Sequence, residues 1–447
     1  MTDYPNVLAY LYSLEKFGIV FGLENIQWIL NCIGNPHGSL KTVHIGGTNG
    51  KGSVAAMLSH ILKDAGYRVG KYTSPHLVSF TERITINEEE ITGAEVADLT
   101  AYIRQHTEGV EPTRTFTFFD FTTALAFEYF RRKNVDIALI EVGLGGRLDS
   151  TNVVNPLFSI ITNVAFDHAD YLGDDIIDIA REKAGIIKRG VPVVTGAQDG
   201  PRNIIEEEGE KFGSPVYALG RDFAHEKKES QTISYAGLSM KLDDVCVNLK
   251  GDHQLANAAI ALCASELLMK YGFRIDEKHL RAGLSQATWP GRIEIVREHP
   301  TIILDGAHNV EGVRALASFL TSQYPDKRRL LIFGVMKDKE YEKMLSELLP
   351  FVSRTILTMT ANDRALSPEL MKKFAPKAVI ASDAISALRE AKSMSEREDV
   401  IVITGSLYLV GECKTFLPYS LFYRRFSYRA LLPVRRLWLK LKYQPRP

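Results

Sequence analysis

Short apolar runs alternate with stretches of helical periodicity along the first two-thirds of the chain. Residues 55–65 carry apolar positions at helical spacing, and 252–272 form another strongly predicted helix. Strands that alternate with helices favour a mostly parallel sheet with both faces covered. Apolar runs that end in glycine or polar residues predict strands within 40–53 and 68–75, and at 135–143, 157–168 and 191–196.

The segment 222–250 has a different pattern, a two-residue alternation of apolar and polar positions. This period predicts a small antiparallel excursion from the parallel sheet. A break follows at 285–294, where Pro290 and Gly291 indicate a turn between two domains.

After this break the alternation of strands and helices starts again. The apolar strands of this second part are predicted within 301–309, 328–336, 354–361, 377–382 and 399–406. We therefore predict an α/β fold with a P-loop NTPase-like doubly wound sheet domain over 1–290, which contains the antiparallel excursion. A smaller Rossmann-like α/β domain is predicted over 296–417, and a basic, aromatic tail occupies 418–447.

Length and composition limit the class of protein, but they do not identify any reaction that it catalyses. A chain of 447 residues is long enough for two domains. It has 54 basic and 54 acidic residues, so net charge gives no argument for a nucleic-acid partner. We see no signal-peptide pattern and no apolar run near the ~20 residues that span a bilayer, and we expect a cytoplasmic protein. The cysteines have no CxxC spacing and are interpreted as free thiols: Cys32, Cys246, Cys263 and Cys413.

A glycine-rich segment, residues 46–53, follows a predicted strand and opens a predicted helix. In this context backbone N–H groups cradle phosphates, Lys51 reaches the β- and γ-phosphates, and the Ser53 hydroxyl reaches Mg²⁺. The spacing departs from the strict phosphate-loop motif, because Ile45 stands where that motif has glycine and Gly52 separates the lysine from the serine. The alternative interpretation is a glycine-rich turn with an exposed lysine.

Three further residues have side chains that suit a metal or phosphate site. Glu141 and His168 end predicted strands, where ligands bind in open α/β sheets. A solvated acid and a capping or core histidine are the alternatives, and on its sequence alone Lys183 is a solvated helix lysine. The segment 143–146 does not fit a dinucleotide fingerprint, because Leu148 replaces the third glycine.

Taken together and in order, the motifs of this chain resemble those of the folylpolyglutamate synthases and of their bifunctional form with dihydrofolate synthase. These enzymes are amide ligases of the Mur type, and the resemblance covers roughly residues 5–415. It makes 1–290 the ATP-binding Mur-ligase-like domain and 296–417 the glutamate-ligase domain. The segments that carry it are GGTNGKGSV, TSPHLVSFTERITIN, EVGLGGRLDSTNV, TNVAFDHADYLG, EKAGIIK, DHQLANAAIAL, WPGRIE, LDGAHN and TGSLYLVGE.

The resemblance implies site residues at matching positions. Those for ATP are Asn49, Gly50, Lys51, Gly52, Ser53, Asn257, Arg292 and Asp305. Those for two Mg²⁺ ions are Ser53, Ser74, Glu141, His168 and Lys183. Lys183 would act as a carbamate, a modification that makes an anionic ligand from an ammonium. The implied catalytic residues are Lys51, Lys183, Asp305 and His308, and the implied pterin contacts are Gly22, Leu23, Thr117, Phe119 and Asp149.

The implied activity is the ATP-dependent addition of L-glutamate to dihydropteroate and to the γ-carboxyl of folates through an acyl phosphate. Alternatives are a folylpolyglutamate synthase only, another Mur-type ligase with a cell-wall or peptide substrate, and a non-enzymatic nucleotide-binding switch. From the resemblance we expect a monomer that binds these small molecules, without nucleic acid or stable membrane insertion. The tail is interpreted as a partly packed extension, and contact with an anionic membrane or RNA is its alternative.

Overall fold

The computed structural model describes residues 3–18, 20–108, 116–167, 173, 175–229 and 231–417. The chain divides into two compact units, Met1–Trp289 (unit 1) and Pro290–Pro447 (unit 2). His168 and the tail 418–447 lie outside the described residues.

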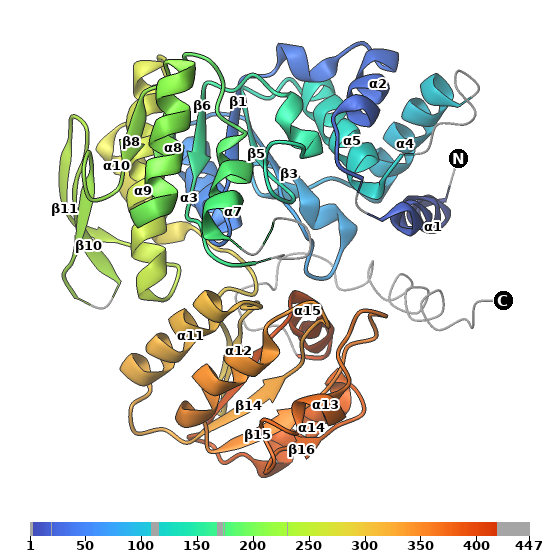
Figure 1. The fold of residues 1–447 in the computed structure, drawn as a ribbon, viewed down its shortest axis with the longest axis vertical. Helices are drawn as coiled ribbons and strands as arrows, with labels where there is room; N and C mark the ends of the chain where they lie inside the picture. The colour runs from blue at the N-terminus through green and yellow to red at the C-terminus, as the bar shows by residue number, and fades with distance from the viewer. Residues whose placement is uncertain are drawn as a thin grey trace. The chain divides into compact units, whose positions relative to one another are not determined.

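Unit 1 is built around an eight-stranded sheet with the order β4-β3-β2-β5-β1-β6-β7-β8 (Figure 1). The strands from β2 to β8 in this order are parallel, whereas β3 and β4 run antiparallel at one edge. The strands are β1 Thr42–Gly46, β2 Val69–Tyr72, β3 Ile84–Ile86, β4 Glu89–Glu90, β5 Ile137–Glu141, β6 Phe158–Ile161, β7 Val193–Thr195 and β8 Val216–Ala218. The parallel sheet that the sequence predicts is confirmed, and the antiparallel edge is an addition to it.

Helices cover both faces of this sheet. In β5, Ile137 and Leu139 belong to one hydrophobic core, which contains α3, α9 and α10. Their neighbours Ala138 and Ile140 belong to another, which contains α1, α2, α4 and α5. Because successive side chains of a strand point to opposite faces, a strand buried on both faces is apolar throughout. The helices are α1 Tyr4–Ser13, α2 Glu24–Cys32, α3 Lys51–Asp64, α4 Gly93–Thr107, α5 Phe118–Arg132, α7 Ile176–Ala184, α8 Asp199–Phe212, α9 Asp252–Lys270 and α10 Glu277–Gln286.

The strand predicted over 157–168 is correct only for its first part. β6 ends at Ile161. The next residues leave the sheet because their polar groups bind the loop after β1: the Thr162 hydroxyl donates to the Asn49 carbonyl at 2.6 Å. β-branched and apolar residues there have strand-like composition, but tertiary hydrogen bonds determine their path.

The predicted antiparallel excursion is confirmed as a three-stranded sheet of β9 Ala224–Lys227, β10 Thr232–Ala236 and β11 Lys241–Cys246. Figure 1 shows it beside α9. The buried Glu266 carboxylate of α9 accepts hydrogen bonds from the Tyr235 hydroxyl at 2.8 Å, and from the Leu238 and Ser239 N–H groups at 2.9 and 2.6 Å. One buried carboxylate therefore fixes this small sheet to the helix.

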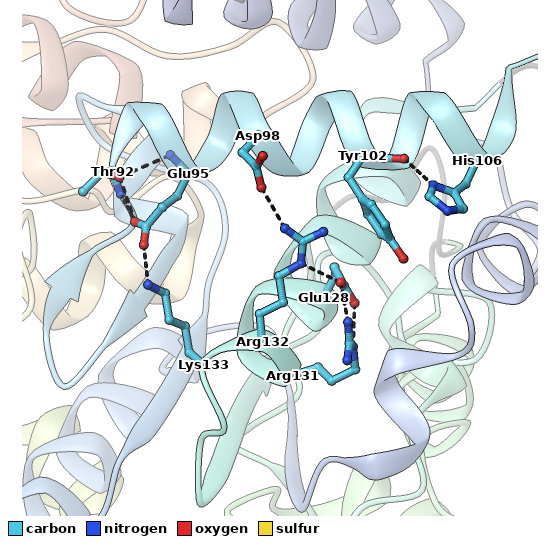
Figure 2. Close-up of polar contacts among 9 residues, drawn as sticks. All are labelled: Thr92, Glu95, Asp98, Tyr102, His106, Glu128, Arg131, Arg132 and Lys133. Atoms are coloured by element: carbon cyan, nitrogen blue, oxygen red, sulfur yellow. Dashed lines mark hydrogen bonds and ion pairs between the residues drawn. The ribbon is translucent and has the colours of Figure 1, made fainter. Parts of the chain in front are cut away.

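A second polar network joins α4 to α5 (Figure 2). The Arg132 guanidinium donates to Asp98 and to Glu128, both at 2.7 Å. Glu128 is fully buried and also accepts from Arg131. Burial alone would raise the pKa of Glu128, but the two guanidinium groups outweigh burial and lower that pKa. A Lys133–Glu95 ion pair adds a further link between the two helices.

Unit 2 has a six-stranded sheet with the order β12-β13-β17-β14-β15-β16. The sheet is parallel except for β12, which pairs antiparallel with β13. The strands are β12 Glu294–Glu298, β13 Thr301–Leu304, β14 Arg329–Phe333, β15 Arg354–Leu357, β16 Val379–Ile380 and β17 Val400–Thr404. The helices are α11 Val310–Gln323, α12 Tyr341–Leu348, α13 Pro368–Met371, α14 Ala384–Met394 and α15 Leu407–Phe416. The predicted Rossmann-like alternation is confirmed.

None of the helices in the described part of the chain combines the length and the apolar composition that a bilayer crossing needs. The four cysteines are free thiols.

Candidate active site

The glycine loop lies at the carboxyl edge of the unit 1 sheet, after the strand β1, which pairs with β5 and β6. Gly47 and Gly50 have positive φ angles of 133° and 85°. A Cβ atom at Gly47 would lie 2.0 Å from the Thr162 hydroxyl oxygen, and one at Gly50 would lie 2.6 Å from the Asn257 side-chain oxygen. Glycine is therefore required twice, for its backbone conformation and for the space around it.

Residues that follow β6 hold the loop in shape. The Thr48 N–H donates to the Asn163 carbonyl at 3.0 Å, and the Asn49 N–H donates to the Asn163 side chain at 2.8 Å. The Thr48 hydroxyl contacts the Ala165 backbone through two hydrogen bonds. The motif alone did not identify these bracing residues, because they come from another strand end.

The helix α3 begins at Lys51, whose ammonium donates to the carbonyls of Gly47 and Thr48 at 3.0 and 3.1 Å. The lysine side chain thus folds back over the loop. The Ser53 hydroxyl is buried and accepts from Gln254 of α9 at 3.2 Å. Gln254 in turn accepts from Asn257 at 3.0 Å, so α9 brings the predicted residue Asn257 to the loop.

Glu141 and Ser74 meet beside this loop. Glu141 ends β5, pairs in register with Ile45 of β1 and is 4% exposed. Its carboxylate accepts from the Ser74 N–H at 3.1 Å. The two predicted metal-binding residues are therefore neighbours at the carboxyl edge of the sheet, where ligands bind in such folds.

Lys183 lies in the last turn of α7 and is 4% exposed. Its pKa is lowered from 10.5 to about 7, chiefly by burial and in addition by the Lys51 ammonium, whereas Asp167 acts in the opposite direction. The influence of Lys51 puts this amine in the electrostatic field of the phosphate loop. Near neutral pH, Lys183 is therefore a mixture of ammonium and free amine.

The loop after β5 fixes the end of α7 that carries Lys183. A Cβ atom at Gly185 would lie 2.4 Å from the Arg147 Cβ, and one at Gly146 would lie 2.8 Å from the Glu182 carbonyl oxygen. The Asn152 amide donates to the carbonyls of Arg147 and Gly185 at 2.8 and 3.0 Å. The glycine-rich segment 143–146 thus serves close packing rather than dinucleotide binding.

Asp149, a predicted pterin contact, binds its own loop. Its carboxylate accepts from the Thr151 hydroxyl at 2.5 Å, the Thr151 N–H at 3.0 Å and the Leu144 N–H at 2.9 Å. The Thr151 oxygen also lies 2.8 Å from Nε2 of the buried His44. Burial lowers the pKa of His44 to about 3, so this imidazole is neutral. Burial raises the pKa of Asp149, so both groups belong to an internal network.

The other predicted pterin contacts gather at the start of α5 and near α2. Thr117 caps α5, and Phe119 covers Gly143, where an added Cβ atom would lie 2.5 Å from its ring. Gly22 and Leu23 directly precede α2, which packs against α5. Leu23 and Phe119 both line the hydrophobic core of these helices.

The predicted residues of unit 2 cluster where β13 ends. The Asp305 carboxylate accepts from the N–H groups of Ile293 and Ala307 at 2.9 and 3.0 Å. His308 Nδ1 donates to the Gly306 carbonyl at 2.8 Å, because a carbonyl only accepts. A Cβ atom at Gly306 would lie 2.3 Å from Arg292 Nη1. The strand end and the first residues of unit 2 thus form one connected group.

Sequence reasoning missed three residues that support the nucleotide loop: Thr162, Asn163 and Gln254. In the sequence, only the polar character of these residues points to a role, because polar side chains next to a strand end or on a buried helix face need hydrogen-bond partners. His168 lies outside the described residues, so its expected metal role remains a prediction.

Comparisons with known proteins place this geometry in a family. The Mur ligase middle domain matches residues 45–265, and the Mur ligase glutamate ligase domain matches residues 291–407. The dihydrofolate synthase/folylpolyglutamate synthase of Bacillus subtilis is 35% identical over 429 residues, which cover 92% of this chain and 99% of that protein.

Two solved structures have the same fold. The folylpolyglutamate synthase of Thermotoga maritima superposes with a TM-score of 0.80 at 39% identity, covering 93% of this chain and 96% of that one. The bifunctional folylpolyglutamate synthase/dihydrofolate synthase of Yersinia pestis, complexed with AMPPNP and Mn ion, superposes with a TM-score of 0.85 at 31% identity, covering 93% and 98%. Full-length matches at this identity, together with the two domain models, show that the chain belongs to the Mur ligase family, in the group of the dihydrofolate synthases and folylpolyglutamate synthases.

Proposed function

We propose that this chain is a bifunctional dihydrofolate synthase/folylpolyglutamate synthase. It uses ATP to join L-glutamate to dihydropteroate and to the γ-carboxyl group of folates. The observation that carries the proposal is the group of Lys51, Ser53, Glu141 and Lys183 at one edge of the unit 1 sheet, in a chain with both Mur ligase domains.

The loop fits a nucleoside triphosphate. Gly47 and Gly50 leave no room for side chains and give the loop its tight path, and the helix N-terminus at Lys51 favours negative charge. We assign the triphosphate to residues 49–53 with Asn257 beside them. In unit 2 we assign nucleotide contacts to Arg292 and Asp305.

The donor set fits magnesium. Ser53, Ser74 and Glu141 offer hard oxygen atoms, which Mg²⁺ prefers. We propose that they hold one ion, and that His168 and carbamylated Lys183 hold a second. Bound magnesium would neutralise charge on the phosphates.

Carbamylation needs a free amine, since an ammonium has no lone pair with which to attack carbon dioxide. A pKa of about 7 leaves much of Lys183 in that form at neutral pH. The carbamate would replace a positive charge by a negative one at the site where Lys51 already repels the ammonium. This change in sign is the electrostatic support for the assignment.

The reaction then needs positioning and charge neutralisation. The pteroate or folate carboxylate attacks the γ-phosphorus, ADP leaves, and an acyl phosphate forms. The neutral amine of glutamate attacks the acyl carbon, loses a proton, and inorganic phosphate leaves as the amide forms. Lys51 would stabilise charge on the transferred phosphoryl group. We assign His308 to the neighbourhood of glutamate and γ-phosphate, and the pterin to Gly22, Leu23, Thr117, Phe119 and the loop held by Asp149.

Phosphate release with ATP, Mg²⁺ and L-glutamate tests the proposal. It is measured separately with dihydropteroate and with tetrahydrofolate, and amide products are identified by mass spectrometry. Glutamate-dependent release with both acceptors is the expected result. Activity with tetrahydrofolate alone would restrict the function to a folylpolyglutamate synthase. Release with neither acceptor would refute the proposal and favour a ligase with a peptide substrate.

A further inference from the structure

Gly52 interrupts the lysine–serine pair of the usual phosphate loop, and its surroundings explain why. It lies in the first turn of α3 and is buried. A Cβ atom added there would lie 2.6 Å from Cζ2 of Trp289, and 2.7 Å from Cε2 and Nε1 of the same ring. No real Cβ contact is that short, so even alanine at position 52 would displace the indole. The space of the missing side chain is filled by Trp289.

The position of Trp289 is set by helix packing. α10 crosses α3 so closely that a Cβ atom at Gly283 would lie 2.6 Å from the Ile61 Cα. The chain after α10 is fixed by the Asn248 amide, which donates to the Ala287 carbonyl at 3.0 Å. The next residues reach the N-terminal turn of α3. The packing of α10 on α3 therefore brings Trp289 to Gly52.

An ion pair between a buried lysine and a partly buried glutamate holds the same indole. The Lys71 ammonium of β2 lies 5.1 Å from the centroid of the Trp289 ring, a distance typical of a cation–π contact. Lys71 is 2% exposed and pairs with Glu88 at 2.5 Å. Glu88 also accepts from the Ser59 hydroxyl of α3 at 2.5 Å. Burying the Lys71 charge is expensive, and neither member of the pair has a part in the reaction proposed above.

We infer that Trp289 is a positioning residue: its indole, held by the Lys71–Glu88 pair, supports the first turn of the phosphate-loop helix. The inference rests on the proposed function, because it assumes that residues 49–53 bind the nucleotide. Trp289 is also the last residue of unit 1 and is bonded to Pro290, the first of unit 2. Trp289 thus contacts the phosphate-loop helix through its side chain, and its position in the sequence directly precedes the segment with Gly291 and Arg292.

Fluorescence provides a test that needs no turnover. The chain has three tryptophans, Trp28, Trp289 and Trp438. A Trp28→Phe/Trp438→Phe protein leaves Trp289 as the sole indole, and Mg·ADP is titrated into it. A saturable change in emission, with the Kd that calorimetry gives, is expected. Calorimetric binding without an emission change overturns the inference alone. Absence of ADP binding in the wild type overturns the proposed function, and the inference with it.

Kinetics separate positioning from bulk stability. Trp289→Ala should lower kcat about 10- to 100-fold, with KM for the folate within about 3-fold, because a misplaced phosphate loop slows the chemical step. Trp289→Phe should restore most of the rate, and Trp28→Phe is the control. The Gly52→Ala/Trp289→Ala double variant should be no slower than its slower parent, since both changes disturb one contact. If the loss of rate in the double variant equalled the product of the two single losses, the inference would be overturned. A Trp289→Ala variant as fast as the wild type would also overturn it.

Discussion

Replacement of Lys183 by methionine should stabilise the protein while it abolishes ligation. Lys183 is 4% exposed, and the structure gives its ammonium no hydrogen bond or ion pair to another described residue. The difference between its ordinary pKa of 10.5 and the pKa of about 7 in the fold corresponds to about 5 kcal/mol, at about 1.36 kcal/mol per pKa unit. Methionine has a similar length and no charge, so Lys183→Met removes this penalty.

The contribution of Lys183 to the free energy of unfolding depends on pH. Between about pH 7 and 10.5 the unfolded chain keeps the proton of Lys183 and the folded chain has lost it, so unfolding takes up a proton. The wild type therefore gains stability from this group as the pH rises through that window. The advantage of Lys183→Met should be about 5 kcal/mol below pH 7 and about 2 kcal/mol near pH 9.

Urea unfolding in metal-free, carbon-dioxide-free buffer measures this difference, with circular dichroism at both pH values. Lys71→Met is the matched control, because Lys71 is equally buried but paired with Glu88. That variant should be destabilised, since it leaves the partly buried Glu88 carboxylate without its charged partner. If Lys183→Met were destabilised like Lys71→Met, or its advantage did not change with pH, the reasoning about an unpaired buried amine would be wrong.

Three further changes test other parts of the molecule. Lys51→Ala should reduce kcat at least about 100-fold and leave the fold intact, because the hydrogen bonds of its ammonium to the described residues go to two carbonyls of its own loop. Glu141→Gln should raise the Mg²⁺ concentration for half-maximal phosphate release by about 10-fold or more, while its amide oxygen still accepts from Ser74. Arg132→Ala should destabilise the fold by about 1–2 kcal/mol in urea unfolding without changing kcat, because Glu128 and Asp98 lose a shared partner.

For each of these three predictions, one result would contradict the reasoning. Near-wild-type ligation by Lys51→Ala would refute the assignment of this segment as a phosphate loop. An unchanged Mg²⁺ requirement in Glu141→Gln would exclude this carboxylate as a ligand. Arg131→Ala, which removes two hydrogen bonds to Glu128 but none to Asp98, should keep the link between α4 and α5 that Arg132 makes. Equal stability of Arg132→Ala and the wild type would show that the network adds nothing.

Local patterns were sufficient to predict the order of strand, glycine loop and helix. Residues 42–64 contain an apolar strand, residues that permit positive φ angles, and a helix with apolar positions at helical spacing, and each of these depends on neighbours in sequence. The same holds for the alternation in 222–250. The sequence could equally place Glu141 at a strand end, because the apolar run stops there.

Features that depend on distant residues could not be predicted this way. The strand reading of 157–168 failed after Ile161 because Thr162 and Asn163 bind the loop after β1. The β3–β4 edge and β12 are short strands with little periodicity, so they went unrecognised. The low pKa of Lys183 depends on burial, which one helix turn does not reveal.

The close approach of α10 to α3 has a consequence for synthesis of the chain. A ribosome has completed the glycine loop long before it makes Gln254, Asn257 and Trp289, which contact that loop or its helix. During this interval the motif exists without the side chains that shape it. A fragment that ends before α9 would contain every residue of the motif and lack this support. A piece expected to hold the observed loop therefore extends at least to Trp289.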